Sequence, residues 1–183
     1  MTDAPRHRLP GDRPPAAEVE RMVRVDHAGE FGATRIYRGQ LEVLQRGLGA
    51  GEIRRMAEAE QRHLAIFETL LRERRIRPTL LQPLWSLAGY ALGAATAVLG
   101  ERAAMACTVA VEEVIDEHYR RQAERLAREE PALTEMILAC RADEIAHRDA
   151  AIAHRAEETV GYDLISAAIK NGSRLAIWLS TRL

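Results

Sequence analysis

Two stretches of the chain decide its fold: AEAEQRHLAIF (residues 57–67) and RADEIAHRDAA (residues 141–151). Each carries the pattern Glu-x-x-His inside a segment rich in residues that favour helices. Because residues three and four positions apart share one helix face, each glutamate lies on the same face as its histidine and its apolar neighbours. Both stretches therefore predict helices that turn an acid and an imidazole toward a core.

Two further glutamates lie in apolar helical stripes without a histidine. Glu30 shares a face with Tyr37, and Glu112 shares one with Tyr119. The order Glu, then Glu-x-x-His, thus occurs twice, with 30 positions between the first two glutamates and 32 between the second two. Two antiparallel helix pairs of nearly equal length would bring six side chains to one level of a four-helix bundle. These are Glu30, Glu60, His63, Glu112, Glu144 and His147.

Composition and helix breakers predict the rest of the architecture. The 183 residues suit one domain, and 47% apolar residues with only 4% aromatic ones are typical of a helical bundle. The breakers are the glycines of GLGAG (47–51), Pro78, Pro83, Gly100, Pro131 and Gly161. They indicate an all-α protein of about six helices without a strand. Residues 1–15, with four prolines and no apolar run, predict a flexible arm ahead of a single domain at 16–183.

Charge and cysteine usage exclude several classes of function. With 26 basic and 27 acidic residues the net charge is -1, which gives no electrostatic footprint for nucleic acid. The basic run from Arg72 to Arg77 remains a candidate contact for anionic lipid. Cys107 and Cys140 stand singly in apolar runs, which favours reduced core thiols over a zinc or disulfide site.

Four carboxylates on apolar faces require a counter-charge. An ionised carboxylate in an apolar interior costs several kcal/mol, so four of them predict bound cations. Carboxylates and imidazoles without thiolate suit iron or manganese better than a structural zinc site. A single Glu-x-x-His is a weak signal, because it also occurs on solvated helix faces. Two copies, each with a matching glutamate, are typical of a di-iron carboxylate bundle.

Polar neighbours of these six residues leave alternatives open. Asp143 precedes Glu144 and His27 lies three residues before Glu30, so either could orient a ligand by hydrogen bonding. Tyr37 and Tyr119 could transfer protons or electrons, or pack in the core with a hydrogen-bonded hydroxyl. The remaining candidates are interpreted as solvated acids or satisfied histidines: Glu113, Asp116, Glu117, His118 and His154.

Four longer blocks carry a resemblance. They are RVDHAGEFGATRIYRGQL (24–41), RPTLLQPLWSLAGYALGAATAVLG (77–100), ACTVAVEE (106–113) and SRLAIWLSTRL (173–183). In this order they resemble the demethoxyubiquinone hydroxylase family of ubiquinone biosynthesis, from about residue 18 to the end. The resemblance implies a ferritin-like fold in which the glutamate of HAGE (Glu30) and the first of VEE (Glu112) join the two Glu-x-x-His pairs. The same six residues are then the metal ligands and act in catalysis through the metals.

The resemblance implies that the protein is a monooxygenase. Two iron ions per chain would use O2 as co-substrate and an external reductant, which the sequence does not identify. One oxygen atom hydroxylates the ring of a polyprenyl methoxy-methyl-benzoquinol, and the other leaves as water. A small homo-oligomer, or association with other proteins of ubiquinone biosynthesis, is compatible with this interpretation.

The lipid tail of such a substrate directs attention to residues 78–100, which carry no charge. That length is compatible with insertion into a membrane surface, with a helix packed in the protein or an oligomer, or with a true span. The stretch DLISAAIKNGSRLAIWLSTRL (163–183) is a second amphipathic candidate, with Lys170, Arg174 and Arg182 available to headgroups. We expect a peripheral enzyme on the cytoplasmic face of a bacterial inner membrane, or on the matrix face in a mitochondrion. The Met1 start without a transit peptide favours the bacterial location.

Three competing interpretations use the same residues differently. A ferritin-like iron store would bind metal through the same six ligands without hydroxylating anything. A soluble di-iron enzyme acting on RNA or peroxide is disfavoured by the balanced charge and by residues 78–100. A structural bundle without metal would need six polar residues at matched levels by accident.

Overall fold

The computed structural model describes residues 15–46 and 48–183, and these residues form helices and short connections. The helices are α1 (Pro15–Val43), α2 (Leu48–Glu73), α3 (Gln82–Val98), α4 (Glu101–Leu126), α5 (Pro131–Ala153) and α6 (Tyr162–Ser180), with a 3-10 turn, η1 (Ala156–Glu158). The all-α prediction of about six helices is confirmed. The predicted arm lies almost entirely outside the described residues, which begin at Pro15, the first residue of α1.

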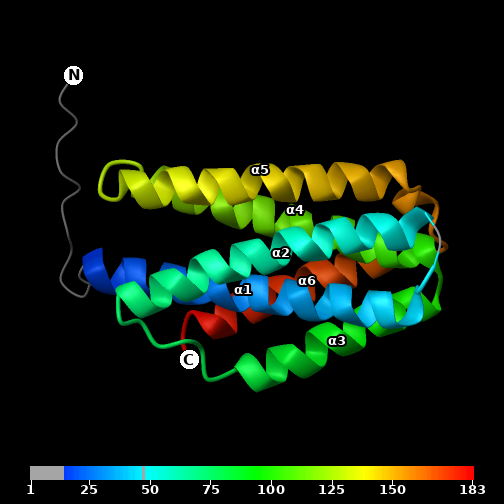
Figure 1. Ribbon diagram of the computed structural model, residues 1–183, viewed down its shortest axis with the longest axis horizontal. Coiled ribbons are helices and arrows are strands. Elements are labelled where there is room, and N and C mark those ends of the chain that lie inside the picture. The colour runs from blue at the N-terminus through cyan, green and yellow to red at the C-terminus, as the bar shows by residue number, and fades with distance from the viewer. Residues whose placement is uncertain (1–14, 47) are drawn as a thin grey trace.

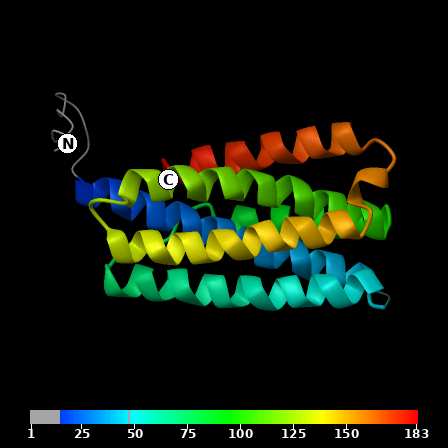
Figure 2. The same ribbon diagram turned by 90° about the horizontal axis from the view of Figure 1, so that it is seen from above.

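Four long helices build the predicted ferritin-like bundle. α1 packs against α2 and α4 packs against α5, as two antiparallel pairs whose halves meet along the bundle axis (Figure 1). α3 lies along α1, and α6 lies along α4 on the side away from α2 (Figure 2). The indole Nε1 of Trp85 in α3 donates to Ser180 Oγ in α6 at 3.0 Å, so the two additional helices also touch each other.

Helix boundaries follow the breakers at most positions. Gly100 separates α3 from α4 with φ 115°, a conformation that glycine adopts without steric cost. Pro131 opens α5, where its missing N–H leaves no hydrogen bond unmade. The segment GLGAG behaves differently from the prediction: Gly49 and Gly51 lie inside α2, and the chain leaves the helix earlier, at residues 44–46. A Cβ at Gly49 would meet only the outer atoms of the flexible Glu101 side chain of α4, which can move aside.

The core consists of two large apolar clusters with a polar level between them, and of a smaller third cluster between α4 and α6 (Cys107, Ala110, Val111 and Ile169). Toward one end of the bundle lie Val23, Phe67, Tyr119 and Ile137, among others. Toward the other end lie Tyr37, Ile53, Met105 and Ala151, among others. Along each of the four bundle helices the chain passes from one cluster to the other through a buried glutamate. Packing on both sides therefore fixes the axial position of the acidic level and keeps water from it.

α3 presents two different faces. Gly89 and Gly93 let it approach α1 so closely that a Cβ at Gly93 would overlap the carbonyl of Ile36. This close contact agrees with a helix packed in the protein, one of the alternatives left open for residues 78–100. The opposite face is apolar and open to solvent, with Leu87 69% and Val98 73% exposed. Among the described residues, no helix has the length and apolarity that crossing a bilayer requires.

Candidate metal centre

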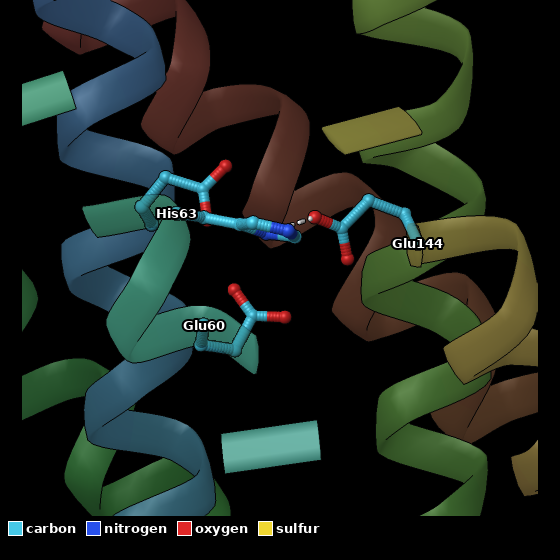
Figure 3. Close-up of side chains that lie close together, drawn as sticks. Glu60, His63 and Glu144 are labelled. Atoms are coloured by element: carbon cyan, nitrogen blue, oxygen red, sulfur yellow. Dashed lines mark ion pairs between the residues drawn. The ribbon is translucent and has the colours of Figure 1, made fainter. Parts of the chain in front are cut away.

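Each bundle helix contributes to the polar level at the centre of the molecule. Glu30 comes from α1, the Glu60–His63 pair from α2, Glu112 from α4, and the Glu144–His147 pair from α5. All six residues are buried, and no glutamate among them is more than 1% exposed. Figure 3 shows Glu60 and His63 facing Glu144 across the space between α2 and α5. The structure thus brings together all six residues that the repeat predicted.

The six side chains form two overlapping groups. One consists of Glu30, Glu60, His63 and Glu144, and the other of Glu60, Glu112, Glu144 and His147. Within each group, one ligand atom per residue lies within 4.8 Å of the others. Glu60 and Glu144 belong to both groups, so their carboxylates stand between the two positions that a pair of cations would take. Sequence spacing alone did not identify these two as the shared residues.

Several oxygen and nitrogen atoms that could bind a metal have no hydrogen-bond partner within the described part of the chain. They are Glu30 Oε2, both carboxylate oxygens of Glu60, His63 Nδ1, Glu112 Oε2 and Glu144 Oε1. Two contacts between these acids and the imidazoles are short without having hydrogen-bond alignment. His63 Nδ1 lies 3.0 Å from Glu144 Oε1, and His147 Nδ1 lies 3.2 Å from Glu60 Oε1. Buried polar atoms almost always find partners, so these lone pairs point to cations.

The pKa values of three glutamates reflect the unneutralised charge. Burial raises the pKa of Glu60 well above its ordinary value, and the charges of Glu144 and Glu30 raise it further. Burial and the charge of Glu144 likewise raise the pKa of Glu112 well above its ordinary value. The pKa of Glu30 is raised for the same two reasons, although the contact between its carboxylate and His63 opposes the shift. Without a counter-charge, these carboxyl groups favour the protonated form.

His63 and Glu144 show the opposite behaviour because they interact with each other. Burial alone would lower the pKa of His63, but its contacts with Glu144 and Glu30 raise it to about 11. Burial alone would raise the pKa of Glu144, but its contacts with His147 and His63 lower it to about 2. In the absence of metal, a proton on an imidazole therefore supplies part of the positive charge that this site demands.

The donor set fits two cations. Four carboxylates and two imidazole nitrogens offer oxygen and nitrogen without sulfur, which suits iron or manganese. The orphaned oxygens occur in both groups, and two of the carboxylates are shared, as in di-iron carboxylate bundles. A bound metal pair would displace the imidazole proton and satisfy the unpaired oxygens.

Three neighbouring side chains hold the candidate ligands in place. Asp143 Oδ2 lies 3.0 Å from His63 Nε2, on the side of the ring away from the other acids. The Tyr37 hydroxyl donates to Glu112 Oε1 at 2.7 Å. The Tyr119 hydroxyl donates to Glu30 Oε1. Of the alternatives predicted for the tyrosines, the structure shows buried rings whose hydroxyls are hydrogen-bonded to candidate ligands.

His27 does not make the contact that was suggested for it. Its side chain is buried, its Nδ1 has no hydrogen-bond partner among the described residues, and burial lowers its pKa. Nearby charge comes from Glu68 rather than from any candidate ligand. His27 is therefore a buried residue of α1 that feels the charge of Glu68 in α2.

The other polar candidates are satisfied away from the centre. His118 Nε2 lies 2.9 Å from Asp26 Oδ1, and His154 Nδ1 lies 3.5 Å from Glu101 Oε1. The three acids of α4 form ion pairs at its outer side: Glu113 with Lys170, Asp116 with Arg141, and Glu117 with Arg121. Both cysteines are free and buried, and burial raises the pKa of the Cys107 thiol to about 12. These findings agree with the sequence interpretation.

One buried cluster was missed in the sequence. Asp26 is 2% exposed, and its Oδ1 accepts hydrogen bonds from Gln122 at 2.7 Å and from His118. Burial raises its pKa, while His118 opposes the shift. The available signal was its position four residues before Glu30, which places it on the same helix face.

Comparisons with known proteins agree with this geometry. A sequence model of the family described as Ubiquinone biosynthesis protein COQ7 matches residues 17–180. A 3-demethoxyubiquinol 3-hydroxylase of Rhodospirillum rubrum is 52% identical over 177 residues, covering 96% of this chain and 84% of its own length.

Mitochondrial relatives are similar over nearly the same region. The NADPH-dependent 3-demethoxyubiquinone 3-hydroxylase of Homo sapiens is 47% identical over 171 residues, covering 91% of this chain and 78% of its own length. The 5-demethoxyubiquinone hydroxylase of Saccharomyces cerevisiae is 40% identical over 185 residues, covering 92% and 79%.

Proposed function

Because the chain belongs to the ubiquinone biosynthesis protein COQ7 family, we propose that it is a di-iron monooxygenase that hydroxylates the ring of a polyprenyl demethoxyubiquinol. The observation that carries the di-iron part is the pair of buried groups that share Glu60 and Glu144. The six residues would hold the two irons: Glu30 and His63 belong to one group, Glu112 and His147 to the other, and Glu60 and Glu144 to both. These six residues act in catalysis through the metals.

The metals supply the binding and reductive activation of O2 when they are present. One oxygen atom enters the quinol ring as a hydroxyl group and the other leaves as water, which consumes two electrons and two protons. The names of several relatives include the words NADPH-dependent, which supports a reduced nicotinamide as the source of the electrons.

The protein's own contribution is position and exclusion of water. Tyr37 and Tyr119 each donate a hydrogen bond to a ligand glutamate and so limit its rotation. Asp143 accepts the Nε2 proton of His63, which leaves Nδ1 free to face a metal. The apolar clusters at both ends of the polar level keep bulk water from the reacting atoms.

The substrate's tail implies a membrane surface, and α3 and α6 offer one. The exposed apolar side chains of these helices include Leu84, Leu87, Leu164, Leu175 and Trp178. Because exposed apolar surface of this extent marks interaction sites, we assign this face to the bilayer surface from which the quinol is drawn. The protein would then be peripheral, on the cytoplasmic face of a bacterial inner membrane or the matrix face of a mitochondrial one. Residues 16–183 act as one domain, alone, in a small homo-oligomer, or with other proteins of ubiquinone biosynthesis.

The decisive experiment compares a candidate ligand with its sequence neighbour. Protein loaded anaerobically with iron and reduced is given a demethoxyubiquinol and O2, and the product is identified by mass spectrometry. We expect about two irons per chain and a ring-hydroxylated product, with both lost in Glu112→Ala. Glu113→Ala is the matched control, because Glu113 is partly exposed and pairs with Lys170 instead of facing the centre.

The same measurements separate the hydroxylase from an iron store. A store would accumulate iron well beyond two ions per chain and would leave the quinol unchanged. If Glu112→Ala formed as much hydroxylated product as the wild type, the assignment of Glu112 would be wrong. If the wild type bound far fewer than two irons per chain, the di-iron centre would be wrong.

A further inference from the structure

A groove on the outer surface between α1 and α2 takes no part in the proposed metal chemistry. It has a volume of about 570 Å³, and its polar lining includes Thr34, Arg35 and Arg38 from α1 and Arg54 and Gln61 from α2. Three arginines therefore line one groove. Guanidinium N–H groups form a planar fork that matches the oxygens of a phosphate group.

Arg35 is built into the fold at the edge of this groove. Its guanidinium carbon lies 4.7 Å from the centre of the Phe31 ring. Its Nε is buried and finds no hydrogen-bond partner within residues 15–46 and 48–183. Gly89 of α3 leaves room for it, because a Cβ at that glycine would lie 3.1 Å from the Cβ of Arg35. The protein thus holds this cation in a restricted position without an acid that pairs with it.

The acids of the groove do not neutralise its arginines. Glu42 is engaged by Arg38 at 3.0 Å and also accepts a hydrogen bond from Tyr90. Glu58 is the second acid of the lining, so three arginines face two glutamates. Arg54 is exposed and forms no ion pair with any described residue. Arg35 and Arg54 are therefore the cations left for a ligand.

The location of the groove indicates which phosphate it meets. α1 lies between α2 and α3 (Figure 1). The sequence of α3 contains no charged residue. The hydrogen bond from Tyr90 of α3 to Glu42 joins the groove directly to that uncharged helix. A helix whose apolar face lies on a bilayer places its polar flanks at the level of the lipid phosphates.

We propose that the groove of Arg35, Arg38 and Arg54 is a phosphate-binding site that takes the headgroup of an anionic lipid. This inference rests on the membrane docking proposed above and adds a specific contact to it. The contact would fix the rotation of the enzyme on the surface, with α3 against the acyl chains and the α1–α2 edge at the headgroups.

The test measures binding of the full-length, iron-loaded protein to vesicles. Vesicles of phosphatidylcholine alone are compared with vesicles that also contain phosphatidylglycerol. We expect Arg54→Gln to weaken binding to the anionic vesicles about fivefold, and Arg35→Gln with Arg54→Gln to weaken it further. Arg55→Gln is the matched control, since Arg55 follows Arg54 on the same helix but pairs with Glu52 outside the groove. It should change binding by less than about twofold.

Soluble probes identify the source of the phosphate. If inorganic phosphate or glycerol phosphate raises the melting temperature of the wild type and not of Arg54→Gln, the groove also accepts free phosphate. If only vesicles discriminate between the variants, the ligand is the lipid headgroup. If Arg54→Gln and Arg55→Gln weakened vesicle binding equally, the site would be refuted. It would also be refuted if neither vesicles nor soluble phosphates distinguished Arg54→Gln from the wild type.

Activity in detergent separates this inference from the proposed function. Arg54→Gln should hydroxylate a detergent-solubilised quinol at the wild-type rate, because Arg54 lies outside the metal centre. Absence of hydroxylation by the wild type would refute the enzyme assignment, whatever the vesicles show.

Discussion

His63 and Asp143 lie 80 residues apart in the sequence, yet His63 Nε2 is 3.0 Å from Asp143 Oδ2. The opposite ring nitrogen of His63, Nδ1, faces Glu144 at 3.0 Å. α5 thus supplies both a candidate ligand that belongs to the two groups and, from the preceding residue, a carboxylate that contacts a histidine of α2. Adjacent helical residues point about 100° apart, so Asp143 reaches the outer side of the ring while Glu144 reaches the inner side.

Replacing this carboxylate should weaken the centre without unfolding the protein. We expect Asp143→Asn to lower iron affinity about 10–100-fold, because the amide no longer holds the proton on Nε2 and the ring loses basicity. The Asp143 side chain is 55% exposed, so stability should change little. Equilibrium dialysis against a competing chelator measures the affinity. Asp149→Asn, a second exposed aspartate of α5 that pairs with Arg148, is the control. Equal affinities for the two variants would contradict the orienting role.

The buried hydrogen bond from Tyr37 to Glu112 should contribute more to stability and to activity than the exposed hydrogen bond from Tyr90 to Glu42. In Tyr37→Phe a buried carboxylate oxygen loses its donor, which costs about 1–3 kcal/mol of unfolding free energy in the metal-free protein. We also expect slower hydroxylation, because Glu112 is freer to rotate. Tyr90→Phe removes the exposed hydrogen bond to Glu42 and should leave both quantities unchanged. Urea unfolding and single-turnover product yields provide the measurements.

Metal-free protein should lose stability as the pH rises. Glu30, Glu60 and Glu112 have pKa values raised above the ordinary 4.5, and that of His63 is raised from 6.5 to about 11. A group with a raised pKa holds more protons when folded, so its contribution is complete at low pH and is lost as the pH rises toward the raised value. Glu144, with a pKa of about 2, adds its full contribution to stability above pH 4.5, so this contribution does not change when the pH rises further.

Urea unfolding of chelator-treated protein at pH 6 and pH 8.5 measures this effect. We expect a smaller unfolding free energy at the higher pH. Metal-loaded protein should show the reverse trend, since deprotonated ligands bind metal more tightly. A metal-free protein that gained stability between these two pH values would contradict the charge assignments of the centre.

Two glycines in helices should respond in opposite directions to the same substitution. Gly93→Ala places a methyl group onto the backbone of Ile36, so α1 and α3 must separate, at a cost of roughly 1–3 kcal/mol or more. A Cβ at Gly51, inside α2, meets nothing within 4 Å. Gly51→Ala should therefore stabilise the protein by about 0.5–1 kcal/mol through helix propensity. Thermal or urea unfolding of both variants checks the signs.

Much of the fold and all six candidate ligands could be predicted from the sequence. The reason is that helical periodicity is local: residues three and four apart share a face whatever the remainder of the chain does. Glu30 and Glu112 stood out because an acid in an apolar stripe needs a partner, and the repeat of Glu-x-x-His supplied one. Gly100, Pro131 and Gly161 marked helix ends because their backbone preferences are intrinsic. GLGAG misled because a glycine inside a helix costs only about 0.5–1 kcal/mol relative to alanine, which the packing of the rest of α2 outweighs.

Only the tertiary structure decided which residues meet across helices. That Glu60 and Glu144 are shared by the two ligand groups depends on the rotation and axial offset of α2 against α5, which side-chain packing sets. The same offsets place Asp143 on His63 and Asp26 on His118, over separations of 80 and 92 residues. No periodicity encodes such contacts, because they arise from how complementary helix surfaces fit together. The sequence by itself thus determined which side chains each helix turns toward the core. Packing of the helices determined which of those side chains contact each other.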